Sequence, residues 1–176
     1  MGFLLLGFMT GDLVGYSASL FYILVYSVMA LGGFGAILLL SKKGFECADL
    51  EDLSGLSQTN PWVAFLLLIV LFSMAGIPPT VGFWSKLYVI QSVVEAGHVG
   101  LAIFAVLSSL IGAYYYLKVV KVMFFDPPKV GHSVTKNYAL SVYSVNGLLL
   151  LGLGLAPGWC LSFCKKLIDA SVRFLG

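Results

Sequence analysis

Long apolar runs separated by short polar stretches dominate the chain and predict membrane-spanning helices. The runs cover residues 13–40, 61–95, 99–125 and 138–163. A helix needs about 20 predominantly apolar residues to cross the roughly 30 Å hydrocarbon core of a bilayer, and each run is long enough. We therefore expect an all-α polytopic membrane protein with about four complete transmembrane helices.

The first apolar stretch, residues 1–9, is too short to cross a membrane, because a helix of that length extends only about 13 Å. It also lacks the basic region and the small-residue cleavage site of a signal peptide. We expect a partial N-terminal helix, the end of a longer helix whose beginning is missing. On this interpretation the chain is truncated.

The run over residues 61–95 is interrupted by Pro78-Pro79 and by Gly82. Tandem prolines remove two backbone donors and stop a continuous helix. Asn60-Pro61 at the start of the run is typical of a helix N-terminus. The segment is therefore either a hairpin that crosses the membrane twice or one broken helix that crosses it once.

The distribution of basic residues favours the single broken crossing. It places the polar loop 41–60 and the loop 126–137 on one side, and the connection 96–98 and the basic C-terminal tail 164–176 on the other. With a single crossing, six lysines lie on the first side of the membrane and three basic residues on the second. A double crossing gives five basic residues on one side and four on the other. By the positive-inside rule both Lys-rich loops are predicted to be cytoplasmic. The six lysines are Lys42, Lys43, Lys118, Lys121, Lys129 and Lys136.

Composition excludes several classes of protein. The 176 residues are 60% hydrophobic and only 10% charged, and the mean hydropathy is +0.99. Soluble domains are about 25% charged, so a soluble globular enzyme and a disordered tail are excluded. A net charge of +2 provides no basic excess for binding nucleic acid. Half of the acidic residues lie in loop 41–60, as expected for a solvated surface.

The chain lacks the usual patterns of metal, nucleotide or nucleophile chemistry. There is no Cys-x-x-Cys pair, no cysteine–histidine cluster and no glycine-rich phosphate loop. Cys47, Cys160 and Cys164 and the two histidines give no ligand set. We expect this chain to bind no cofactor and no metal.

Lys86 is the one basic residue deep inside a hydrophobic run. It lies about 15 Å below the interface at Gly97, near the middle of the hydrocarbon core. A lysine there costs about 2.5–3.5 kcal/mol on insertion scales, and its side chain is too short to reach the interface. Broken helices beside an ionisable residue recur in ion and proton pathways. We therefore predict that Lys86 faces a cavity and relays protons.

Other polar side chains in the hydrophobic runs have two interpretations. They could line a wet path to Lys86, or they could serve ordinary packing between membrane helices, and packing is the favoured interpretation. Asn146 in particular is expected to bond to a neighbouring helix, and Glu95 to be solvated. The possible path residues are Tyr22, Tyr26, Ser27, Ser85, Ser108, Ser109 and Asn146.

Two segments carry a resemblance to a known family. Residues 73–88, SMAGIPPTVGFWSKLY, and residues 112–125, GAYYYLKVVKVMFF, resemble the antiporter-like membrane subunits of proton-pumping NADH:quinone oxidoreductase, respiratory complex I. Within them the similarity is greatest to subunit N, the counterpart of mitochondrial NADH dehydrogenase subunit 2. The resemblance covers essentially the whole chain.

The resemblance implies a fold and a function. Such subunits have about fourteen transmembrane helices in two inverted repeats, each with one broken helix. This chain would match the C-terminal third, with residues 61–95 as the second broken helix and Lys86 as the lysine that passes protons onward. The first repeat, which carries a glutamate and two further lysines of the path, is absent.

The resemblance also implies surroundings. The chain would lie in the bacterial inner membrane, in contact with the lipid bilayer and other membrane-arm subunits. NADH, flavin, iron–sulfur clusters and quinone would be handled by other subunits. Two alternatives stay open, namely a subunit of a cation/proton antiporter complex, whose large subunits share this fold, and a non-pumping structural remnant.

Overall fold

The computed structural model describes residues 2–41, 47, 49–128 and 137–175, and this part of the chain contains helices and no strand. The elements in order are α1 (Gly2–Met9), α2 (Leu13–Leu40), the 3-10 turn η1 (Leu50–Leu53), α3 (Leu56–Thr59), α4 (Pro61–Ala75), α5 (Val81–Glu95), α6 (Val99–Phe125), α7 (Asn137–Leu155) and α8 (Pro157–Leu175). Helices α2 and α6 and the part of α7 from Tyr138 to Leu155 are long and apolar enough to cross a membrane.

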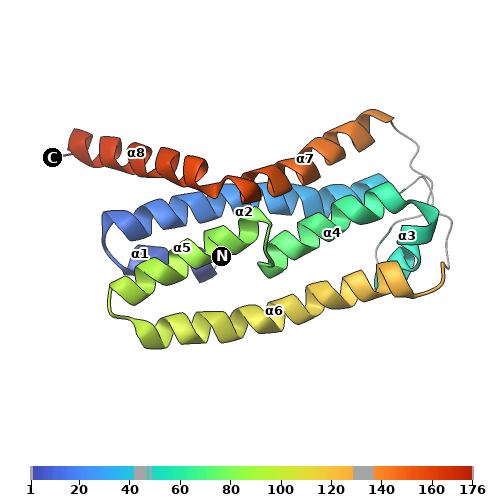
Figure 1. Cartoon of the computed structure of the whole chain (residues 1–176), viewed down its shortest axis with the longest axis horizontal. Coiled ribbons are helices and arrows are strands. Elements are labelled where there is room, and N and C mark those ends of the chain that lie inside the picture. The colour runs from blue at the N-terminus through green and yellow to red at the C-terminus, as the bar shows by residue number, and fades with distance from the viewer. Residues whose placement is uncertain (1, 42–46, 48, 129–136, 176) are drawn as a thin grey trace.

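Helices α4 and α5 lie end to end along the long axis of the molecule, between the full-length helices α2 and α6 (Figure 1). The connection from α2 to α4 and the end of α6 lie at the same end of the bundle, where the backbone N–H of Gly55 donates to the carbonyl of Val122. This arrangement agrees with the single broken crossing that charge bias favours. Lys42, Lys43, Lys129 and Lys136 lie outside the described residues.

Local sequence explains both ends of α4. Pro61 occupies its first position, where a missing N–H costs nothing. At the other end Gly76 adopts a left-handed φ of 86°, and its N–H bonds to the carbonyls of Phe72 and Ser73. The prolines 78 and 79 follow, and α5 begins directly after Thr80.

The turn between α1 and α2 is held by Asp12, the N-cap of α2. The backbone N–H of Gly15 and the hydroxyl of Thr10 both donate to its carboxylate, at 2.7 Å each. These two hydrogen bonds hold the pKa of Asp12 below its ordinary value. The short helix α1 packs against α2 and α5 and thereby reaches the middle of the bundle.

The last crossing differs from the expectation of one helix over residues 138–163 with a separate tail. Helix α7 ends at Leu155, and a new helix, α8, runs from Pro157 to Leu175. Pro157 has no N–H and its ring clashes with the preceding turn, so the helix cannot continue through it. Both helices pack along α2, one on each half of its length (Figure 1). The basic residues Lys165 and Lys166 are therefore helical.

Close backbone contact holds the helices around the break. A Cβ at Gly82 would overlap the carbonyl of Ser73, and one at Gly154 would overlap the carbonyl of Pro79. The N–H of Gly82 also donates to the hydroxyl of Ser73 at 3.1 Å, which satisfies one of the free donors at the start of α5. Only glycine allows these two approaches.

We expect Gly82→Ala to destabilise the fold by about 1–3 kcal/mol, because overpacking forces backbone to shift. Thermal unfolding in detergent, followed by circular dichroism, measures the effect. Gly152→Ala is the matched control, since a Cβ at that helical glycine meets nothing within 4 Å. Equal unfolding temperatures for the two variants would contradict the close approach at residue 82.

Candidate functional site

Lys86 lies in the second turn of α5, and its side chain returns to the end of α4. Its Nζ donates to the carbonyls of Met74 and Ala75, at 2.9 Å each, and to the hydroxyl of Ser109 on α6 at 3.0 Å. An ammonium has three N–H donors, so these acceptors satisfy all of them. The lysine thus caps the C-terminus of α4, the end of a helix that attracts positive charge.

The two carbonyls lack helical donors because α4 ends at its C-cap, Gly76, and tandem prolines follow. In an α-helix the carbonyl of residue i accepts from the N–H of residue i+4. For Met74 and Ala75 those donors would belong to Pro78 and Pro79, which have no N–H. An unpaired carbonyl at membrane depth costs several kcal/mol. The ammonium of Lys86 takes the place of the two missing donors.

A cavity of about 350 Å³ adjoins the ammonium. Helices α1, α2, α4, α5 and α6 all contribute to it, and its lining includes Lys86, three tyrosines and two serines. The ring of Phe3 lies 5.7 Å from Nζ, within the range of a cation–π contact. The lining residues are Gly2, Phe3, Tyr22, Tyr26, Met29, Met74, Lys86, Ser108, Ser109, Gly112 and Tyr116.

A second cavity, of about 250 Å³, lies between α5 and α6 on the other side of the lysine. It is mainly apolar, and it shares only Lys86 and Ser109 with the first cavity. These two residues therefore line both spaces.

Some of the predicted site residues line the Lys86 cavity, and others lie outside it. Tyr22 and Tyr26 stack on each other, with ring centroids 6.1 Å apart, in the wall of the Lys86 cavity. Ser85 is fully buried outside this cavity and donates to the carbonyl of Gly82 at 3.0 Å. Pro78, Pro79 and Gly82 form or adjoin the break itself.

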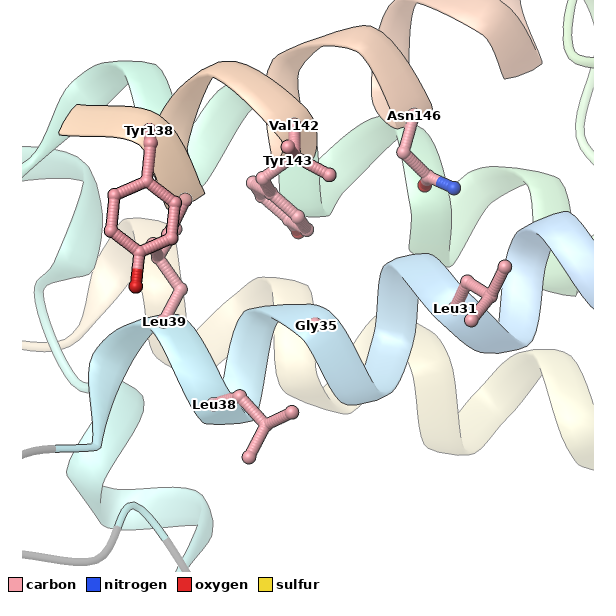
Figure 2. Close-up of a pocket in the computed structure, with 9 residues that line it drawn as sticks. Leu31, Gly35, Leu38, Leu39, Tyr138, Val142, Tyr143 and Asn146 are labelled. Atoms are coloured by element: carbon pink, nitrogen blue, oxygen red, sulfur yellow. The ribbon is translucent and has the colours of Figure 1, made fainter. Parts of the chain in front are cut away.

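Asn146 also lies away from Lys86. Its Nδ2 donates to the carbonyl of Val28 at 3.0 Å, so it bonds to the neighbouring helix α2. It lines an apolar groove of about 490 Å³ between α2 and α7, opposite Leu31 and Gly35 (Figure 2). A bond from Asn146 to a neighbouring helix is expected from the sequence. The other expected position, in a wet path to Lys86, does not agree with this placement.

Some site residues were not found from the sequence. Gly112 and Tyr116 line the cavity one and two turns along α6 from Ser109. Their spacing of three and four residues places them on one helix face, and this signal could have identified them. Met29 carries the same signal, since it follows Tyr22 and Tyr26 at spacings of seven and three residues. Phe3 carries none, because only the packing of α1 brings it to the lysine.

Trp84 connects the two helix breaks. Its indole Nε1 donates to the carbonyl of Gly154 at 2.9 Å, in the last turn of α7. Gly154 in turn lies against the backbone of Pro79 and Thr80. The end of α7 therefore rests on the break between α4 and α5.

No group of three or more His, Cys, Asp or Glu side chains in the described residues could hold a metal ion. Glu95 accepts from the amide of Gln91 at 2.9 Å on the exposed side of α5, as a solvated carboxylate does. The polar groups at the centre of the bundle are the ammonium of Lys86 and the hydroxyl of Ser109 that it contacts.

Residues 1–112 match the model of the NADH:quinone oxidoreductase/Mrp antiporter transmembrane family. The match includes the broken helix and Lys86. The chain belongs to this family.

Relatives in the family are identical to this chain at about half of the aligned positions. Subunit N of NADH-quinone oxidoreductase from Thiobacillus denitrificans is 51% identical over 172 residues, which are 97% of this chain and 36% of the relative. The same subunit from Acidithiobacillus ferrooxidans is 52% identical over 166 residues, 93% of this chain and 34% of the relative. The chain thus spans about a third of the length of these curated relatives.

Solved structures of the family have the same fold. One structure is respiratory complex I from Thermus thermophilus with bound aureothin. One of its chains matches 92% of this chain over 36% of its own length, with a TM-score of 0.79 and 30% identity. Another is the Mrp complex from Dietzia sp. One of its chains matches 95% of this chain over 40% of its own length, with a TM-score of 0.81 and 24% identity.

We expect Trp84→Phe to lower the free energy of unfolding by about 1–2 kcal/mol, because it leaves the carbonyl of Gly154 without its donor. Thermal unfolding in detergent measures this loss. The control is Trp159→Phe, at a side chain that is 76% exposed. If both variants unfold at the same temperature, the indole does not hold the two breaks together.

Proposed function

We propose that this chain is a membrane-arm subunit of proton-translocating NADH:quinone oxidoreductase, in which Lys86 relays protons at the middle of the membrane. It would contribute to coupling electron transfer from NADH to quinone with proton translocation. The observation that carries the proposal is the hydrogen-bonded ammonium of Lys86 at a helix break, beside a cavity lined with hydroxyls. The high identity to subunit N supports it.

The geometry suits a group that must gain and lose a proton. Desolvation disfavours the charged lysine, whereas three acceptors and the negative end of α4 favour it. No acidic side chain lines the Lys86 cavity within the described residues, so no fixed counter-charge holds the lysine in one state. A cavity of about 350 Å³ whose walls include polar side chains has room for the water that would exchange the proton.

The same proposal places the chemistry of the complex elsewhere. NADH, flavin, iron–sulfur clusters and quinone would be bound by other subunits, and this chain would contact the lipid bilayer and other membrane-arm subunits. It would lie in the inner membrane of a bacterium as a multi-pass protein. The antiporter-like domain would comprise residues 1–163.

Replacing Lys86 with alanine should reduce NADH-driven proton uptake by at least about tenfold, the scale of a lost proton-transfer group. Lys86→Arg should also impair uptake, because a guanidinium stays charged. The assay uses inverted membrane vesicles that contain the complex with this chain. Lys118→Ala, at an exposed position near the end of α6, should pump normally. Uptake at the unmodified rate in Lys86→Ala would refute the relay.

A second candidate is a subunit of a cation/proton antiporter complex. The TM-score of 0.81 to a chain of the Mrp complex favours it at the level of fold. Sodium-linked proton movement without NADH-driven pumping, in the same vesicles, would point to this function. A structural remnant would give a third result. Neither activity would change in Lys86→Ala, but removal of the chain would prevent assembly of the complex.

The orientation can be tested with single cysteines after the three native cysteines are replaced by alanine. Gln58 and His98 are exposed at opposite ends of the bundle. If loops 41–60 and 126–137 are cytoplasmic, a membrane-impermeant maleimide should label His98→Cys in right-side-out vesicles and Gln58→Cys only in inverted ones. The reverse labelling pattern would show the opposite orientation.

A further inference from the structure

We propose that the hydroxyl of Ser109 transfers the proton that Lys86 releases. This inference rests on the proposed function, since it assumes that Lys86 exchanges protons. It adds a second proton-transferring residue, from a different helix. The supporting observations are the chemistry of the three acceptors around Nζ and the position of Ser109 between two cavities.

The three acceptors of the ammonium are not equivalent. The oxygens of Met74 and Ala75 are backbone carbonyls, which accept hydrogen bonds and have no proton to donate. The hydroxyl of Ser109, 3.0 Å from Nζ, both accepts and donates. Of the three hydrogen bonds, only this one can therefore conduct a proton away from the lysine.

The transfer balances without any other group on the protein. The Nζ–H bond directed at Ser109 breaks, and its proton bonds to Oγ. The proton previously on Oγ passes to a water molecule in the adjoining cavity, where it forms hydronium. Ser109 then donates an O–H to the lone pair of the neutral amine, and the amine keeps its two N–H bonds to the carbonyls.

Both protonation states are therefore fully hydrogen-bonded in one geometry. The ammonium donates three hydrogen bonds, and the amine donates two and accepts one from Ser109. A carbonyl in place of the hydroxyl would leave the lone pair of the amine unpaired, and a buried polar group without a partner is destabilising. The serine thus removes a penalty that would otherwise oppose deprotonation.

The position of Ser109 agrees with this role. Apart from Lys86, it is the residue that lines both cavities. Ser108, Gly112 and Tyr116 continue the polar cavity along α6. A proton that leaves through Ser109 enters this space beside the hydroxyls of Ser108 and Tyr116, and not the apolar cavity between α5 and α6.

The test compares Ser109→Ala, Ser109→Thr, Ser162→Ala and Lys86→Ala in vesicles that contain the complex with this chain. We expect Ser109→Ala to reduce NADH-driven proton uptake by about tenfold or more, as Lys86→Ala does. Ser109→Thr should restore most of the rate because it keeps the hydroxyl. Ser162→Ala should pump normally, since Ser162 is exposed on α8, outside the Lys86 cavity, and its hydroxyl donates to the carbonyl of Gly158.

The outcomes separate this inference from the proposed function. Loss of uptake in Lys86→Ala with unchanged uptake in Ser109→Ala would overturn the role of Ser109 and leave the relay intact. Equal losses in the alanine and threonine variants of Ser109 would also overturn it, because packing would then be responsible and not the hydroxyl. Unchanged uptake in Lys86→Ala would overturn the proposed function itself.

Discussion

The structure depends on two backbone carbonyls that have lost their helical donors. Because Pro78 and Pro79 follow Met74 and Ala75 by four residues, α4 ends at membrane depth with both oxygens unpaired. The ammonium of Lys86 binds both of them. Each partner alone would be costly in a bilayer, the carbonyls as free acceptors and the lysine as a free charge. Together they offset each other, and the break and the lysine become a single unit.

The remaining helices are arranged around this unit. Helix α6 supplies the third acceptor, Ser109, and the end of α7 rests on the backbone of the break through Gly154. The indole of Trp84 donates to the Gly154 carbonyl, so the second interruption, before Pro157, is also supported by α5. Two interrupted helices side by side leave many backbone groups without helical partners. They are tolerated because each break lies against protein and provides donors or acceptors for its neighbours.

The hydrophobic pattern and the charge bias were sufficient to predict the helices, the single broken crossing and the isolated lysine, since these depend on local properties of the chain. The apolar pattern does not predict the end of α7 at Leu155, because apolar residues continue on both sides of Pro157. The helix nevertheless ends there, since proline has no N–H. The cavity lining was only partly predictable. Periodicity shows which residues share a helix face, but it does not show where their side chains bond. Ser85 donates to the carbonyl of Gly82 in its own helix, and Asn146 donates to the carbonyl of Val28 on α2.

The direction of side chains on a helix explains why the lysine stands where it does. Side chains tilt toward the N-terminus of their helix, so Lys86 points back along α5 to the break. A lysine side chain extends about 6 Å, enough to reach the last carbonyls of α4 from the second turn of α5. One helical turn further along, the same side chain would start about 5.4 Å more distant and would miss them. The positive N-terminus of α5 would repel the ammonium, and the negative C-terminus of α4 attracts it. The position of the lysine therefore follows from helix geometry and from the polarity of the break.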